Sequence, residues 1–217
     1  MYIIADYVQT GDVTIDATCG NGQDTVRLAE LDPTRLFAFD IQEEAVRATL
    51  ERLEESGYGE ALAEGRIHVM RLGHEHMAEY FRTLADDPGT LPRAKAFAGV
   101  IVFNLGFLPG GDKAITTKAE TTLEAVRQSM DLLAQDGLIC ITMYSGHEEG
   151  KREKAELLKF AEALDSHVWH VSYIQMLNQK KDPPEILLIT RKSETRSDHK
   201  PDSKSEPDAQ SEADPRS

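Results

Sequence analysis

Short runs of apolar residues recur along the chain at the length expected for buried strands. Between most of these runs, apolar residues return every three or four positions, as on one face of a helix. The runs predict strands at residues 13–18, 36–41, 67–72, 97–104, 138–144, 168–176 and 185–191. The helical spacing predicts helices at residues 43–56, 121–134 and 151–164.

The order of these elements predicts an α/β fold. Strands that alternate with helices form a parallel sheet covered by helices on both faces. Only the loop NQKKDPP (178–184) separates the last two strand runs. A parallel connection would need a crossover helix, so these two strands are expected to form an antiparallel hairpin. We therefore expect a Rossmann-like, mostly parallel, seven-stranded sheet with a closing antiparallel hairpin.

Composition divides the chain into two parts. Of its 217 residues, 40% are hydrophobic, enough for one domain with a sizeable core, which we assign to residues 1–192. From Ser193 onward two alanines are the only apolar residues, and seven acidic side chains stand against four basic ones. Such a segment cannot bury enough surface to offset the entropy of ordering it. We predict that residues 193–217 form a disordered acidic tail.

Several functional classes are disfavoured by composition. No segment approaches the roughly 18–20 apolar residues of a membrane span, and the N-terminus MYIIADYVQTGD lacks the pattern of a signal peptide. The two cysteines are expected to be free thiols of a cytoplasmic protein, and no Cys/His spacing suggests a metal site. The net charge of −14 argues against a wholly basic nucleic-acid-binding face, although a local basic patch remains compatible with it.

The stretch 16-DATCGNGQDT-25 follows the first predicted strand and carries two closely spaced glycines. Gly20 and Gly22 would let the backbone turn tightly and approach a ligand just before a helix. Asp40 ends the second strand, where a carboxylate can accept hydrogen bonds from both ribose hydroxyls of a nucleoside. The pattern favours nucleoside binding, although the glycines could serve the turn alone.

The acidic residues near this loop favour one nucleoside cofactor over another. The dinucleotide fingerprint places a small residue where this chain has Thr25, preceded by Asp24. A carboxylate would repel a pyrophosphate but tolerate a sulfonium and its amino group, so S-adenosylmethionine fits better than NAD. Asp16 would face the cofactor's amino group or cap the strand end. Asp24 and Thr25 could equally belong to the first helical turn.

A second polar loop, 104-NLGFLPGGDK-113, follows the fourth predicted strand. In an open α/β sheet the ligand crevice lies at the carboxyl ends of the strands, where this loop and the first one meet. The Asn104 side chain could accept a hydrogen bond from a substrate amine and orient its lone pair toward a methyl donor. Asp112 could act as general base, partner a cation or cap a turn. Asn104 could instead cap the strand, and the glycines could form a plain turn.

Five blocks together, DATCGNGQDT, FDIQ, FNLGFLPGGDK, YSGHEEGK and NQKKDPP, resemble the putative rRNA methylase family of small bacterial class I methyltransferases. The resemblance covers about residues 10–192 in order. It implies a class I methyltransferase fold with S-adenosyl-L-methionine as cofactor. It also implies a tRNA substrate in which wobble 5-aminomethyl-2-thiouridine is methylated to 5-methylaminomethyl-2-thiouridine.

The resemblance assigns roles to particular residues. Cofactor contacts are implied for Asp16, Thr18, Gly20, Asn21, Gly22, Asp24, Thr25, Asp40 and Gln42. A further cofactor contact is expected for His74, which lies at the predicted edge of the crevice. Catalytic roles are expected for Asn104, Asp112 and His147, and substrate contacts for Leu105, Gly106, Pro109, Gly110, Gly111 and Asn178. The chain departs from the family pattern at Gly73, where the family has serine, and at Ser145, where it often has histidine.

Alternatives remain open on sequence grounds. The substrate could be ribosomal RNA or a small metabolite, and the departures at Gly73 and Ser145 leave room for a non-catalytic nucleoside- or RNA-binding module. A tRNA substrate needs basic phosphate contacts. Candidates are 151-KREK-154, Lys180, Lys181, Arg191 and Lys192, each of which could also be an ordinary solvated charge. A homodimer is also left open.

Overall fold

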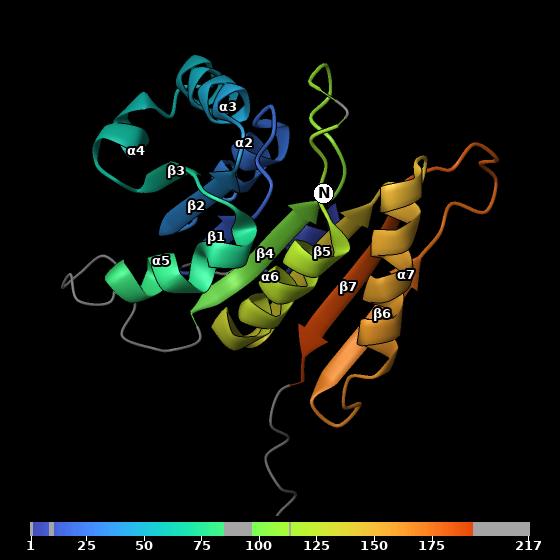
Figure 1. Cartoon of the computed structure of the whole chain (residues 1–217). Coiled ribbons are helices and arrows are strands. Elements are labelled where there is room, and N and C mark those ends of the chain that lie inside the picture. The colour runs from blue at the N-terminus through green and yellow to red at the C-terminus, as the bar shows by residue number, and fades with distance from the viewer. Residues whose placement is uncertain (1, 9–10, 85–96, 113, 193–217) are drawn as a thin grey trace, which may run out of the picture.

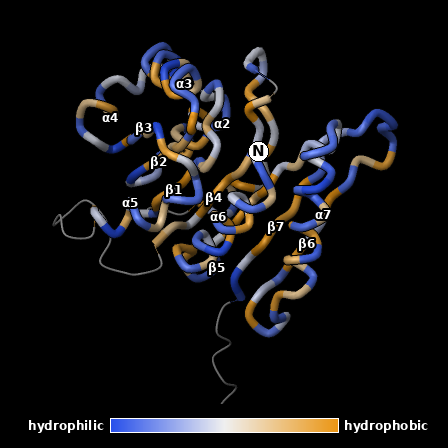
Figure 2. Tube along the Cα trace, in the orientation of Figure 1, coloured by the Kyte–Doolittle hydropathy of each residue, from blue (hydrophilic) through white to orange (hydrophobic). Residues whose placement is uncertain are grey.

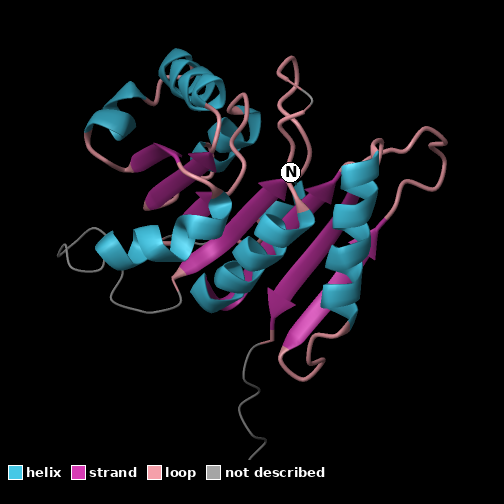
Figure 3. Ribbon diagram, in the orientation of Figure 1, coloured by secondary structure: helices cyan, strands magenta, loops and turns pink. Residues whose placement is uncertain are grey.

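The computed structural model describes residues 2–8, 11–84, 97–112 and 114–192, so the predicted disordered tail lies outside the described residues. Within them, seven strands form one sheet, whose strands are magenta in Figure 3. Their order across the sheet is β3-β2-β1-β4-β5-β7-β6. The strands are β1 (Val13–Asp16), β2 (Arg35–Asp40), β3 (Ile67–Arg71), β4 (Ala98–Asn104), β5 (Leu133–Met143), β6 (Trp169–Ile174) and β7 (Glu185–Arg191).

The strand pairing confirms the predicted mostly parallel sheet with a closing hairpin. Strands β1 to β5 pair in parallel, whereas β7 runs antiparallel to both β5 and β6. Because β7 lies between β5 and β6, β6 points in the same direction as β5. The loop after β6 therefore leaves the sheet at the same edge as the loops after β1, β2 and β4.

Helices cover both faces of the sheet (Figure 1). One face packs against α5 (Met77–Leu84), α6 (Ala119–Leu132) and α7 (Glu148–Glu162). The other packs against α1 (Tyr2–Ala5), α2 (Gln23–Ala29), α3 (Glu43–Glu55) and α4 (Gly59–Ala63). A short 3-10 helix, η1 (His74–His76), precedes α5.

The central strands are apolar along their whole length because both of their faces are covered. In β4 every residue from Ala98 to Phe103 is buried. Hydropathy mapped on the chain shows hydrophobic central strands and mostly hydrophilic loops (Figure 2). Phe37 and Phe39 of β2 meet Tyr80 and Phe81 of α5 edge to face, which fills the core beneath α5.

Two helices differ from prediction at their ends. The helix predicted at 151–164 begins at Glu148, directly after His147, whose backbone is extended. The helix predicted at 121–134 ends at Leu132, because Leu133 is extended and pairs with Ala98 of β4. Cys19 and Cys140 are buried free thiols, as expected.

Candidate functional site

A cavity of about 650 Å³ opens at the carboxyl edge of the sheet, between the loops after β1, β2 and β4 and the short helix η1. Its lining includes predicted site residues from all of these segments: Thr18, Gly20, Asn21, Asp24, Asp40, Gln42, His74, Asn104, Leu105, Gly106 and Pro109. The structure thus gathers residues up to 91 positions apart in the sequence around one space. Other predicted residues lie outside the lining: Asp16, Gly22, Thr25, Gly110, Gly111, Asp112, His147 and Asn178.

Asp40 stands at the end of β2 with its carboxylate against the first loop. One oxygen accepts the backbone N–H of Gly20 (3.0 Å) and the other accepts that of Gln42 (2.9 Å). Burial raises the pKa of Asp40, and these hydrogen bonds oppose the shift. Each carboxylate oxygen has two lone pairs, so each can still accept a hydroxyl. Asp40 therefore fits the two ribose hydroxyls of a nucleoside cofactor.

The two glycines of the first loop have different roles. Both have positive φ angles, +50° at Gly20 and +75° at Gly22, a region that favours glycine. A Cβ on Gly22 would lie 2.8 Å from the Cα of Thr49, so Gly22 lets α3 pack closely against the start of α2. Gly20 lines the cavity, and its carbonyl accepts the Thr49 hydroxyl at 3.0 Å. Gly22 therefore supports the loop from behind, while Gly20 forms part of the cavity wall.

Asp16 is fully buried behind the loop. Its carboxylate accepts the Thr25 hydroxyl at 2.7 Å and the backbone N–H of Thr18 at 3.2 Å. Burial removes the carboxylate from water and raises the pKa of Asp16 to about 7. Thr18 in turn accepts the backbone N–H of Asn104 at 2.6 Å. Asp16 and Thr25 thus brace the first loop, and Thr18 connects that loop to β4.

The raised pKa of Asp16 predicts a pH dependence of stability. The folded pKa lies above the unfolded value near 3.9, so the folded state holds the proton more tightly. The stabilising contribution is complete below about pH 4 and is lost as the pH rises to about 7. Chemical denaturation of the wild type and Asp16→Asn, without added cofactor, should show the wild type losing stability relative to the variant over this range. The slope should reach up to about 1.4 kcal/mol per pH unit; a constant difference between the two proteins would contradict the assignment.

Asn104 is held in a defined orientation by Asp24. The Asn104 amide nitrogen donates to one oxygen of the Asp24 carboxylate, and the other oxygen accepts from Arg27 at 3.0 Å. An ionised carboxylate only accepts hydrogen bonds, so it must face the amide nitrogen of Asn104 rather than its oxygen. Asp24 and Asn104 both line the cavity. This pairing leaves the Asn104 carbonyl oxygen as the part of the amide that can accept a hydrogen bond from a ligand.

The loop between β4 and α6 is tied to its neighbours on both sides. The Asn21 side chain donates to the Pro109 carbonyl at 3.2 Å, which connects the first loop to this one. Asp112 accepts the backbone N–H of Ala114 at 2.9 Å, so this exposed carboxylate caps a local turn. The His147 ring contacts the Thr116 hydroxyl (3.2 Å) and lies edge-on to Phe107. Asp112 and His147 thus support the loop, and of the three predicted catalytic residues Asn104 lies in the cavity wall.

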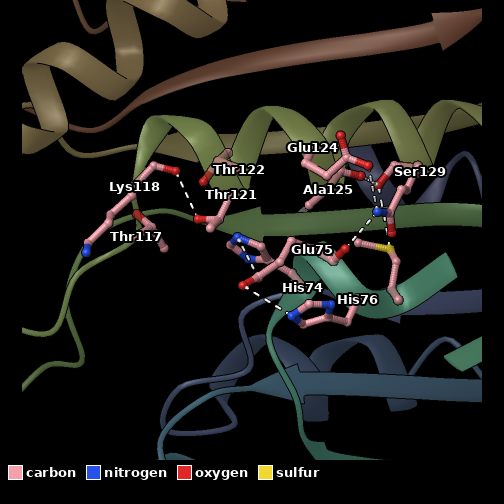
Figure 4. A network of polar contacts seen from close by, with 12 residues as sticks. His74, Glu75, His76, Thr117, Lys118, Thr121, Thr122, Glu124, Ala125 and Ser129 are labelled. Atoms are coloured by element: carbon pink, nitrogen blue, oxygen red, sulfur yellow. Dashed lines mark hydrogen bonds and ion pairs between the residues drawn. The ribbon is translucent and has the colours of Figure 1, made fainter. Parts of the chain in front are cut away.

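Another part of the cavity wall is formed by η1, which packs against α6. Figure 4 shows His74 and Glu75 on η1, with Thr117, Lys118 and Thr121 above them. Burial lowers the pKa of His74, whose ring lies edge-on to Phe103. The Gln128 side chain donates to the Glu75 carbonyl at 2.7 Å and accepts the Ala78 N–H at 2.9 Å, which fixes η1 against α6.

Sequence reasoning missed several residues of the cavity. Tyr144, Phe107 and Ile115 line it although their side chains remain 46%, 36% and 40% exposed. Large exposed apolar side chains around one opening mark a binding surface. Tyr144 belongs to the YSGHEEGK block, so the sequence already pointed to this segment. The sequence did not show that β5 pairs with β4, which brings Tyr144 beside the loop after β4.

Neither a metal centre nor a membrane helix is found in the described part of the chain. Within it, no cluster of three or more His, Cys, Asp or Glu side chains could hold a metal ion. None of its helices is long and apolar enough to cross a membrane.

The chain is similar to proteins of known family. Residues 36–190 match the family described as "Putative rRNA methylase". A chloroplastic tRNA (mnm(5)s(2)U34)-methyltransferase from Arabidopsis thaliana is 32% identical over 193 residues, which are 86% of this chain. The chain spans 66% of the length of that plant relative.

Solved structures share the fold as well as sequence. A "putative rRNA-methylase" from Clostridium thermocellum is 33% identical, with a TM-score of 0.75, over 88% of this chain and 94% of its own. A "putative methyltransferase" from Streptococcus mutans in complex with SAH (S-adenosylhomocysteine) is 30% identical, with a TM-score of 0.72 and the same coverage. The chain therefore belongs to the rRNA methylase family, as a class I methyltransferase that uses S-adenosyl-L-methionine.

Proposed function

We propose that this enzyme methylates the amine of 5-aminomethyl-2-thiouridine at the wobble position of tRNA, giving 5-methylaminomethyl-2-thiouridine. The observation that carries the proposal is the pairing of Asn104 with Asp24, which leaves an amide oxygen at the cavity wall to accept an amine N–H. The name of the plant relative supports the choice of amine, since it specifies a methyltransferase of the modified wobble uridine.

Methyl transfer requires that the acceptor amine be aligned with the methyl group, because the methyl donor is already reactive. When bound, S-adenosyl-L-methionine supplies an electrophilic methyl group on a sulfonium sulfur. Asp40 and the backbone around Gly20 would hold its ribose. The acceptor amine must be neutral, because an ammonium has no lone pair. Asn104 would accept one of its N–H groups and thereby direct the lone pair toward the methyl donor.

The mouth of the cavity suits a nucleobase. RNA-modifying enzymes extract the target base from its neighbours and stack it on aromatic or apolar side chains. Phe107, Ile115 and Tyr144 provide such surfaces on the side of the cavity formed by the loop after β4 and the end of β5. A small aliphatic amine has too little surface to cover these exposed apolar side chains, whereas a nucleobase can stack on them, so this observation favours a nucleoside acceptor.

Several candidates for phosphate contacts already have partners within the protein. Lys151, Arg152 and Lys154 of the KREK segment form ion pairs with Glu148, with Glu120 and Glu149, and with Glu185, respectively. The Arg191 guanidinium lies over the Trp169 ring. Lys180 and Lys181 are exposed in the loop after β6, which leaves the sheet at the cavity edge. We infer that Lys180 and Lys181 contact the tRNA backbone.

The double variant Lys180→Ala/Lys181→Ala should weaken tRNA binding. Each lost phosphate contact should lower the slope of log K against log salt by about 1, so the variant should lose up to about 2 units of slope. Filter binding of tRNA across a salt series measures this slope. The matched control is Lys159→Ala, which removes an exposed lysine in the last turn of α7. An unchanged slope in the double variant would remove these lysines from the interface.

Nucleoside analysis tests the proposed substrate. Mass spectrometry of tRNA from a strain lacking the gene should show 5-aminomethyl-2-thiouridine in place of its methylated form, and an added gene copy should reverse this. The same strain's ribosomal RNA provides the comparison. Normal wobble nucleosides together with a missing methyl group in ribosomal RNA would favour the rRNA substrate implied by the family description.

A further inference from the structure

Glu153 is a buried carboxylate that the proposed chemistry does not use. It lies on α7 with 2% of its surface exposed. Its two oxygens accept the hydroxyls of Thr117 (2.8 Å) and Thr122 (2.5 Å). Burial raises the pKa of Glu153, and these two hydrogen bonds oppose the shift. Burying a carboxylate costs free energy that its hydrogen bonds offset only in part. An apolar side chain would therefore stabilise the fold as well, unless the carboxylate has a further role.

What the carboxylate does is set the direction of a hydrogen-bond chain. The Thr117 hydroxyl donates its single proton to Glu153, so toward any other partner it must accept. It accepts the backbone N–H of Gly106 at 2.9 Å. The Thr117 backbone N–H returns to the Gly106 carbonyl at 3.0 Å. Gly106 and Thr117 are thereby joined twice.

This double connection closes the base of the loop between β4 and α6. The next pair outward, Phe107 and Thr116, forms an antiparallel bridge. Figure 1 shows the loop as a tall, narrow protrusion beyond the end of β4. Gly106, Phe107, Thr116 and Thr117 all line the cavity, whereas Glu153 stands behind them. The closure begins two residues after Asn104.

We propose that Glu153 is a positioning residue for methyl transfer. From outside the cavity it fixes the base of the β4–α6 loop, and through Gly106 it sets the position of Asn104 and of the acceptor wall. Thr122 holds the second oxygen of Glu153 from α6, so the carboxylate joins α6, α7 and the loop at one point. Glu153 contacts only protein groups in this network, so its role does not depend on which acceptor the cavity takes.

Backbone exchange tests the role without any acceptor. In Glu153→Ala, hydrogen exchange at the Gly106 and Thr117 amides should accelerate by about tenfold or more, because the hydroxyl that holds the loop base loses its partner. The affinity for S-adenosylhomocysteine, measured by calorimetry, should change by less than about threefold, since Asp40 and Gly20 are untouched. Glu153→Gln should give a smaller acceleration, because its amide oxygen can still accept from one threonine.

Two residues of the same helix provide matched controls. Leu157→Ala removes a fully buried side chain one turn further along α7, which should lower the melting temperature without altering exchange at Gly106 and Thr117. Glu156→Ala removes an exposed carboxylate, so the melting temperature and the exchange rates at Gly106 and Thr117 should both stay unchanged. If Glu153→Ala only lowered the melting temperature, as Leu157→Ala should, the positioning role would be overturned.

Kinetics with tRNA provide the second arm. We expect kcat/KM for tRNA to fall about 10²-fold in Glu153→Ala, the effect of displacing a reacting group by about 1 Å, with the KM for S-adenosyl-L-methionine nearly constant. A parallel loss of cofactor affinity would also overturn the role. Should the wobble-uridine assignment fail, the exchange measurement still decides the inference, because it needs no RNA.

Discussion

Replacement of Asn104 by alanine is expected to lower kcat about 10²–10³-fold, the loss typical of removing one oriented hydrogen-bond partner from a reacting group. The reason is the contact with Asp24, which leaves the amide oxygen to orient the acceptor amine. Because the cofactor ribose is held by a different strand, the dissociation constant of S-adenosylhomocysteine should change by less than about threefold. Single-turnover kinetics and calorimetry measure the two quantities separately.

A control amide separates catalysis from general damage. Gln135 is exposed at the opposite end of the sheet, near the start of β5, so Gln135→Ala should leave kcat unchanged. If Asn104→Ala weakened S-adenosylhomocysteine binding as strongly as it lowered kcat, Asn104 would be a cofactor contact and the acceptor role would be wrong.

The Asp40→Asn variant should weaken cofactor binding and leave kcat nearly unchanged, the reverse of what we expect for Asn104→Ala. Hydrogen bonds to a charged group contribute about 1.5–3 kcal/mol each, so losing the charge and one acceptor should weaken S-adenosylhomocysteine binding about 10–100-fold. With the cofactor at saturation, kcat should remain within about threefold of wild type. The physical cause is that Asn has a single acceptor oxygen, whereas both Asp40 oxygens already accept backbone N–H groups.

Glu43 provides the matched control for Asp40. It lies three residues further along the chain, is exposed and pairs with Arg71 on the surface. Glu43→Gln should therefore bind S-adenosylhomocysteine as the wild type does. Unaltered cofactor affinity in Asp40→Asn would remove Asp40 from the ribose site.

Much of the fold could be predicted because its signals are local. The central strands are buried on both faces, which produces continuous apolar runs such as 97–104, and the short 178–184 loop excludes a crossover helix. The order of the last two strands was harder to predict. Nothing in the local pattern indicates that β7 inserts between β5 and β6.

The candidate site was only partly predictable, because residues at strand ends can be recognised from local patterns whereas side-chain contacts between distant segments cannot. Asn104, Asp40 and Gly20 stand at strand ends, where the topology of parallel sheets implies a crevice, and all three line the cavity. Asp112 and His147 have residue types suited to proton transfer, but neither of them lines the cavity. The Asp112 side chain accepts the Ala114 N–H, and the His147 ring contacts the Thr116 hydroxyl. Their catalytic role stays a prediction.

Other residues depended on tertiary contacts that the sequence does not display. In the sequence, Glu153 is one of many charged residues in a predicted helix. Only the structure shows that Thr117 and Thr122 donate hydrogen bonds to its buried carboxylate. Within 151-KREK-154, the pairing of Lys151 with Glu148 and of Arg152 with Glu149 follows from helical spacing. The pairing of Lys154 with Glu185 needs β7 beside α7, and it withdraws that lysine from the predicted phosphate contacts.

The most direct test of the central claim follows the methyl group itself. Purified enzyme is incubated with S-adenosyl-L-methionine carrying a trideuteriomethyl group and with tRNA from a strain that lacks the gene, and the digested nucleosides are analysed by mass spectrometry. We predict that the label appears on the side-chain amine of 5-aminomethyl-2-thiouridine, and that Asn104→Ala transfers almost none. Label on another nucleoside, or none on tRNA while ribosomal RNA is labelled, would contradict the proposed function.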